Sequence, residues 1–175
     1  MSYSKKKDHD NTCTYSPCSC PFSNCNFTSS SEQLYLHFSS LHSDSAVRFR
    51  YDSKFTVTMN ACEKFLILLE QNDNISFILY RSVERLGSVV WVSCISPHSS
   101  HKWFDYDILA KNELDTLTLQ SATTCTQGQV DSPLPIGFLL VPSDFLATRS
   151  ELKLHLEIFK DSTTPACSER SINAV

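Results

Sequence analysis

The sequence predicts a mainly β fold, in which a small module rich in cysteine and histidine is followed by an antiparallel β-sandwich. Four cysteines crowd between positions 13 and 25, with two histidines close behind, and short β-type segments fill most of the remaining chain. A hydrophobic fraction of 41% over 175 residues is enough for a real core. We expect the Cys/His module at 13–42 and the sandwich at 47–160, with a polar tail at 1–12 and a flexible tail at 161–175.

Two kinds of segment predict the strands. Residues 152–158 and 115–119 alternate apolar with polar side chains, as a strand with one buried face does. Other segments are almost continuously apolar, which is typical of central strands covered on both faces. Their short length and their Val, Ile and aromatic content favour strand over helix. These continuous segments are 65–69, 75–80, 89–95 and 138–141.

Three short segments are expected to connect these elements. Asn72-Asp73-Asn74 is a turn signal and predicts a hairpin between its flanking strands. Pro142–Leu146 fits a short helix with Ser143 as its cap. Ser43-Asp44-Ser45 is interpreted as a short hinge between the two modules.

The Cys/His module has the spacing of a metal site. Cys20 and Cys25 are followed by eleven residues and His37, then by four residues and His42. Zinc prefers four such thiolate and imidazole ligands in a tetrahedron, with two on a tight turn and two near a helix end. A segment of about 25 residues cannot hold itself together by apolar burial, so the metal must supply folding free energy on the order of 10 kcal/mol. We expect loss of Cys25 to unfold this zinc-finger module and leave the sandwich folded.

A helix is expected to carry the two histidines. Ser29 and Glu32 form a possible capping box, and Gln33 to Leu41 follow as helix. One stripe of that helix is apolar apart from its histidine. The stripe consists of Leu34, His37, Phe38 and Leu41.

Other cysteines and one histidine leave alternatives open. His9 and Cys13 have the spacing of half of another zinc site, but two ligands cannot close a tetrahedron, so binding and a mere tail remnant both remain possible. Cys18 is an alternative third ligand for that pair, or a substitute for Cys20. The scattered cysteines are interpreted as small buried apolar groups. They are Cys62, Cys94, Cys125 and Cys167.

Charge and hydropathy argue against nucleic-acid and membrane partners. The net charge is −4, and the only basic cluster is Lys5-Lys6-Lys7. No Lys or Arg lies between Asn26 and His42, where a DNA-reading finger would need them. The longest apolar run, Phe65–Leu69, is far shorter than the ~20 residues of a membrane helix. With no visible targeting segment, we expect the protein in the cytoplasm, the nucleus or both.

The sequence favours a binding protein over a self-sufficient enzyme. It contains no nucleophile elbow and no paired-carboxylate site, and its three glycines leave little room for a phosphate loop. Four aromatic residues are candidates for a binding groove, although core packing is the preferred interpretation. They are Trp91, Trp103, Phe104 and Tyr106.

Several motifs together resemble one known family. The strongest are residues 13–22 (CTYSPCSCPF), 25–27 (CNF) and 34–42 (LYLHFSSLH). Softer matches are 48–51, 104–106 and 138–142. These residues resemble the seven-in-absentia family, and most of all its plant SINA-like branch. The likeness covers about residues 9–160.

That resemblance implies a ubiquitin-protein ligase with an N-terminal RING that recruits the conjugating enzyme. Two zinc fingers would follow, and then a TRAF-like β-sandwich that binds substrates and dimerises. The matching positions for the second finger's ligands are Cys20, Cys25, His37 and His42. His9 and Cys13 match the last two ligands of the first finger.

The RING and the first finger's two cysteines have no counterpart in these 175 residues. We therefore expect the zinc-binding substrate-recognition or adaptor portion of such a ligase, acting in ubiquitin-dependent degradation but inactive alone. Its expected partners are substrate peptides, family members as homo- or hetero-dimers, and a conjugating enzyme only through a RING-bearing partner. The alternatives are a RING-less dominant inhibitor or adaptor paired with complete paralogues and, less favoured, a single-finger nucleic-acid-binding protein.

Overall fold

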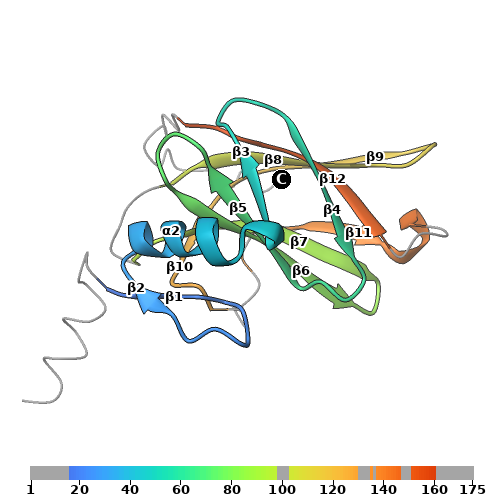
Figure 1. The fold of residues 1–175 in the computed structure, drawn as a ribbon. Helices are drawn as coiled ribbons and strands as arrows, with labels where there is room; N and C mark the ends of the chain where they lie inside the picture. The colour runs from blue at the N-terminus through green and yellow to red at the C-terminus, as the bar shows by residue number, and fades with distance from the viewer. Residues whose placement is uncertain (1–15, 98–102, 130–134, 136, 147–150, 161–175) are drawn as a thin grey trace, which may run out of the picture.

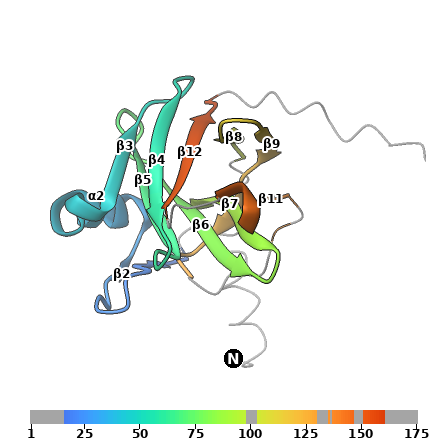
Figure 2. The same ribbon diagram turned by 90° about the vertical axis from the view of Figure 1, so that its right-hand side faces the viewer.

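The computed structural model describes residues 16–97, 103–129, 135, 137–146 and 151–160. Within these ranges the chain forms three layers, which are the finger, a middle sheet and an outer sheet (Figures 1 and 2). The two expected tails, 1–12 and 161–175, lie outside the described residues.

The finger layer contains a two-stranded hairpin and the single α-helix of the described residues. Its elements are β1 (Cys18–Ser19), β2 (Thr28–Ser29), α2 (Ser31–Leu41) and a 3₁₀ turn, η1 (Ser43–Ser45).

The middle sheet has the order β10-β7-β6-β5-β3, with β11 also paired to β7. Its strands are β3 (Ala46–Phe49), β5 (Phe65–Glu70), β6 (Ser76–Glu84), β7 (Gly87–Ile95), β10 (Thr124–Thr126) and β11 (Leu139–Pro142). The outer sheet has the order β4-β12-β8-β9. Its strands are β4 (Phe55–Asn60), β8 (Asp105–Lys111), β9 (Thr116–Ala122) and β12 (Glu151–Ile158). A second 3₁₀ turn, η2 (Ser143–Leu146), follows β11.

These layers confirm the predicted mainly β fold with a small finger followed by an antiparallel β-sandwich. All pairs in the outer sheet are antiparallel. Two pairs near the edges of the middle sheet are parallel instead, β3 with β5 and β10 with β7. Such pairs need long crossovers, which local sequence patterns do not reveal.

The main core lies between the two sheets, and the predicted alternation explains how it forms. On β12 the four aliphatic residues from Leu152 to Ile158 are buried in this core, and the residues between them are more exposed. On β9, Leu117 and Leu119 are only partly buried against the same core. The alternating segments are therefore the strands of the outer sheet, whose other face meets solvent.

The middle sheet is covered on both faces. All nine residues of β7 are buried, and so are the first six residues of β6, most of which are apolar. One face packs on the outer sheet and the other beneath the finger. This double burial explains the continuous apolar runs in the sequence.

The connecting segments match their predictions only in part. The hairpin at Asn72–Asn74 is present: the buried carboxylate of Glu70 accepts hydrogen bonds from the backbone N–H groups of Asn72 and Asp73, at 2.7 and 2.6 Å. Asn74 adopts the left-handed region with φ 54°. The short helix expected at Pro142–Leu146 is a 3₁₀ helix over Ser143–Leu146, in which Ser143 is the first residue and not the preceding cap. The expected hinge at 43–45 is also a 3₁₀ turn, and it leads directly into β3.

Three of the four candidate groove aromatics are core residues. Trp91, Phe104 and Tyr106 are buried, and Phe104 stacks on Tyr51 at 5.6 Å. Only Trp103, at 54%, is exposed. Core packing is therefore the correct interpretation for most of this set.

A buried arginine joins the two sheets near one end of β4. Arg81 on β6 is 7% exposed, and its Nη1 donates to the carbonyls of Met59 and Asn60 at 3.2 and 2.7 Å. Its Nε donates to Ser88 Oγ at 3.1 Å. Burial lowers the pKa of Arg81, and the nearby Glu63 opposes that shift. The guanidinium thus bridges the two sheets at the end of β4, where the Asn60 carbonyl also accepts from the N–H of Glu63 at 3.1 Å.

We expect Arg81→Met to destabilise the fold by about 2 kcal/mol, because the buried hydrogen bonds that join the two sheets through this side chain are lost. Urea unfolding followed by circular dichroism measures this change. Arg85→Met, at an exposed position in the following turn, is the matched control and should have little effect. Equal stability of the two variants would contradict a stabilising role for the Arg81 hydrogen bonds.

Candidate metal centre

A tight hairpin positions the two cysteines of the finger. Cys20 follows β1, and its backbone N–H donates to the Phe27 carbonyl at 2.9 Å. The N–H of Cys25 donates to the Phe22 carbonyl at 3.0 Å. These bonds fold the segment back on itself, so that both thiols face the helix.

The helix α2 positions the two histidines. Its cap is Ser30, one residue after the predicted Ser29, and Ser30 Oγ accepts from the N–H of Gln33 at 3.3 Å. His37 lies on the buried face, and His42 is the C-terminal cap residue. The apolar stripe is shorter than predicted, because Leu41, the last helical residue, is 73% exposed.

The structure brings the four predicted ligands together. The Sγ of Cys20 lies 3.6 Å from Nε2 of His42, and the Sγ of Cys25 lies 3.2 Å from Nε2 of His37. All four ligand atoms lie within 4.8 Å of one another. A tetrahedral zinc ion with these ligands has edges of roughly 3.4–3.8 Å, so the donor set and its spacing fit zinc.

Burial shifts the pKa values of His37 and Cys20 in opposite directions. It lowers the pKa of His37, as does the neighbouring His42, so this imidazole is neutral at neutral pH with a lone pair ready for a metal. Burial raises the pKa of Cys20 to about 11, and the adjacent Cys25 contributes to the rise. The Cys20 thiol therefore keeps its proton until a metal displaces it, and metal binding releases protons.

Two phenylalanines orient the histidine rings, and sequence analysis missed both. Phe27 stacks on His37 at 4.2 Å and 3°, and Phe22 stacks on His42 at 4.2 Å and 13°. Each phenylalanine follows a ligand cysteine by two residues. This repeated Cys-x-Phe spacing was the signal available in the sequence. Side chains that contact metal ligands and fix their orientation increase the metal affinity of a site.

The other predicted cysteine roles have mixed outcomes. Cys18 of β1 is fully buried between the finger and the middle sheet and is not part of the four-residue Cys/His group, so it does not substitute for Cys20. Burial and the nearby Cys125 raise the pKa of Cys18 to about 11. Cys94 is buried as predicted and Cys125 only partly so. Cys62 is exposed, contrary to prediction, because it lies in the turn between β4 and β5. His9, Cys13 and Cys167 lie outside the described residues.

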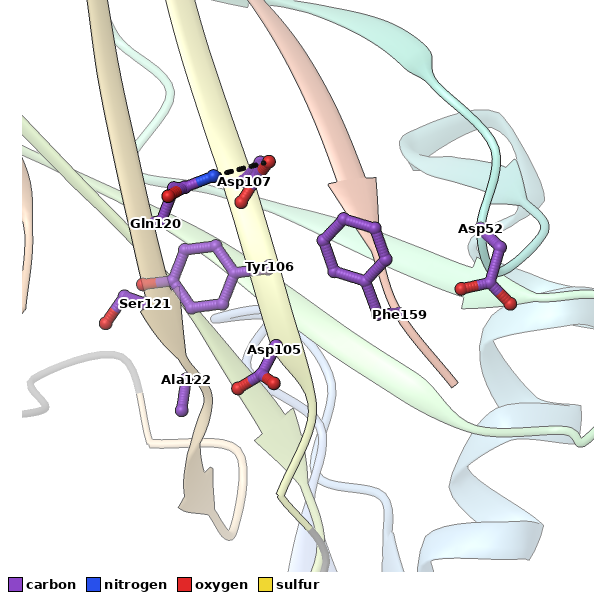
Figure 3. A pocket seen from close by; sticks show the side chains of 8 residues that line it. All are labelled: Asp52, Asp105, Tyr106, Asp107, Gln120, Ser121, Ala122 and Phe159. Atoms are coloured by element: carbon purple, nitrogen blue, oxygen red, sulfur yellow. Dashed lines mark hydrogen bonds between the residues drawn. The ribbon is translucent and has the colours of Figure 1, made fainter. Parts of the chain in front are cut away.

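A hollow of about 620 Å³ lies beside β8 and β9, and none of its lining residues belongs to the Cys/His cluster (Figure 3). Three carboxylates line it, from Asp52, Asp105 and Asp107, together with the ring of Phe159. The amide of Gln120 donates to Asp107 at 3.3 Å. No local pattern in the sequence indicates this hollow, because its residues come from segments that are distant along the chain.

Comparisons with known proteins agree with this geometry. A family model described as "Sina, zinc finger" matches residues 1–56. E3 ubiquitin-protein ligase SINA-like 10 of Arabidopsis thaliana is 30% identical over 159 residues, which are 90% of this chain and 45% of the relative. The putative E3 ubiquitin-protein ligase SINA-like 6 of the same plant is 32% identical over 149 residues, covering 82% of this chain and 53% of the relative. Residues 1–56 thus match the Sina zinc finger, and most of the chain is similar to SINA-like proteins.

Zinc is accordingly the cofactor of this chain, as the Cys/His cluster and the match to the Sina zinc finger together indicate. The chain spans about half the length of the curated relatives it matches. Within the described residues, no helix is long and apolar enough to cross a membrane.

We expect Cys25→Ser to reduce bound zinc from about one ion per chain to almost none, because three ligands close a tetrahedron poorly. Elemental analysis of protein purified under reducing conditions measures the stoichiometry. Cys62→Ser removes an exposed thiol outside the cluster and should leave zinc content unchanged. Full zinc content in Cys25→Ser would show that this thiol is not a ligand.

Proposed function

We propose that this chain is the substrate-recognition or adaptor part of a SINA-type ubiquitin-protein ligase and acts in ubiquitin-dependent protein degradation. Its relatives bear the name E3 ubiquitin-protein ligase and match it over most of its length. The observation that carries the proposal is a β-sandwich with open strand edges, held against a zinc finger of that family. The proposed division is finger at 13–42 and sandwich at 47–160.

In this proposal the zinc ion is structural, and Cys20, Cys25, His37 and His42 are its four ligands. Four protein ligands fill a tetrahedron and leave no position for a water or a substrate, which a catalytic zinc needs. Cys20 and Cys25 are free thiols, as zinc ligation requires. A reducing compartment, the cytoplasm or the nucleus, supports that state.

The outer sheet offers two edges for an extended protein segment. Among the described strands, β4 pairs only with β12, and β9 pairs only with β8. Neither β4 nor β9 contains a charged residue or a proline, the usual devices that block strand addition. Main-chain hydrogen bonds to such an edge give affinity, and side-chain pockets beside it give selectivity. This chemistry suits a protein substrate better than a nucleic acid.

Lysine substitutions at the two edges test peptide recognition. Peptides of about 12 residues, long enough to lie along a strand edge, are selected from a random display library on the wild-type chain, and calorimetry measures their binding. We expect either Thr118→Lys on β9 or Thr58→Lys on β4 to weaken binding at least about tenfold, because an exposed lysine on an edge opposes strand addition. The unaffected variant of the pair is the control for folding. Unchanged binding in both variants would refute recognition at a strand edge.

A ubiquitin-transfer assay tests the adaptor role. The 175-residue chain is incubated with ubiquitin, its activating enzyme, a conjugating enzyme and a peptide-tagged substrate. We expect no ubiquitin chains from this protein alone, and transfer when a complete RING-bearing relative is added. Suppression of the relative's activity would instead support the dominant-inhibitor role. Chain formation without the relative would overturn the adaptor proposal.

A further inference from the structure

We infer that zinc stabilises the β-sandwich as well as the finger, because the finger forms one wall of a second hydrophobic core. The sequence suggested two modules joined by a hinge, with a sandwich indifferent to loss of the metal. The contacts between the layers indicate a single cooperative unit whose sheet depends on a metal bound outside it. This inference goes beyond the proposed function and does not require it.

The second core lies between the finger and the middle sheet (Figure 2). From the finger, Leu34 and Phe38 of α2 are fully buried in it. From the sheet, aromatic and aliphatic side chains face them, and Trp91 stacks on Tyr80 at 5.0 Å. The sheet residues of this core are Ile67, Leu69, Ile78, Tyr80, Val89, Trp91 and Ile95. Without the finger, this whole apolar face would meet water.

One aromatic side chain links a proposed metal ligand to the sheet. Phe22 stacks on His42 at 4.2 Å, and the same ring meets Phe65 of β5 edge-on at 5.2 Å. Phe22 also lies 6.5 Å from Phe38 of the helix. The orientation of a zinc ligand is thus set partly by a side chain of the sandwich.

Backbone and side-chain hydrogen bonds attach the finger to a second part of the sandwich, the loop after β10. The N–H of Ser19 donates to the Gln127 carbonyl at 2.8 Å, and Nε2 of Gln127 donates to Ser16 Oγ at 2.8 Å. Gly128 has φ 92°, and a Cβ there would collide with the Ser19 carbonyl oxygen. The loop after β10 therefore packs directly on the finger backbone.

These contacts connect metal binding to the stability of the sheet. The finger is too small to stay folded without its ion, so metal loss removes α2 from the sheet. Coupling of this kind is reciprocal. A contact that the sandwich makes only with the folded, metal-bound finger therefore raises zinc affinity, and removing that contact lowers zinc affinity by the factor that the contact had added.

Fluorescence of Trp91 tests whether zinc binding stabilises the middle sheet. Trp91 is 4% exposed in the second core, and Trp103 is replaced in a Trp103→Phe background so that Trp91 is the only tryptophan. On zinc removal by a chelator we expect a red shift of Trp91 emission, binding of an apolar dye and a lower urea midpoint, all reversed by added zinc. An unchanged emission and midpoint in metal-free protein would overturn the inference.

A pair of phenylalanine variants tests whether contacts of the sandwich raise zinc affinity. Phe65→Ala removes the sheet's contact with Phe22, and Phe55→Ala removes a similarly half-buried ring that stacks on Phe49 in the main core. Competition with a chromophoric chelator measures zinc affinity under conditions where both variants are folded. We expect a drop of about tenfold for Phe65→Ala and no change for Phe55→Ala. Equal zinc affinities of the two variants would refute the coupling. That result would leave the proposed function open, because the ubiquitin and peptide assays test it independently.

Discussion

The middle sheet must be shielded from water on both faces, and this requirement shapes the other two layers. Every residue of β7 is buried, so neither face of this strand tolerates solvent. The outer sheet covers one face through the alternating aliphatics of β12. The other face is covered by an 11-residue helix, which is too short to persist alone in water. Zinc binding keeps that helix folded. The metal site therefore helps to keep the second face of the middle sheet covered.

Local patterns in the sequence predicted the elements of this arrangement well. The strict alternation of residues 152–158 and the continuous apolar run at 89–95 both identify strands, and they also distinguish a sheet with one covered face from a sheet with two. The four members of the Cys/His cluster were found because their spacing alone is typical of a finger. What covers the second face of β7 was not predicted, since no periodicity says which surface of α2 meets which strand.

The remaining features depend on residues that meet only in the folded chain. Phe22 and Phe65 lie far apart in the sequence, yet their rings pack edge to face. The carboxylates of Asp52 and Asp105 line one hollow although they belong to different segments (Figure 3). Cys62 is exposed because of its place in a turn, and its residue type favours the opposite expectation. In each case tertiary contacts, which a single sequence does not display, decide the environment.

The attachment of the finger to the loop at Gln127 and Gly128 has a consequence for the order in which the chain becomes structured on the ribosome. Cys20 to His42 emerge early and need only one another and an ion to fold. The strands that pack on α2 emerge later, and the loop that fastens the finger emerges later still. A metal-loaded finger would then act as a template, offering nascent β5, β6 and β7 an apolar surface before the outer sheet exists to protect them.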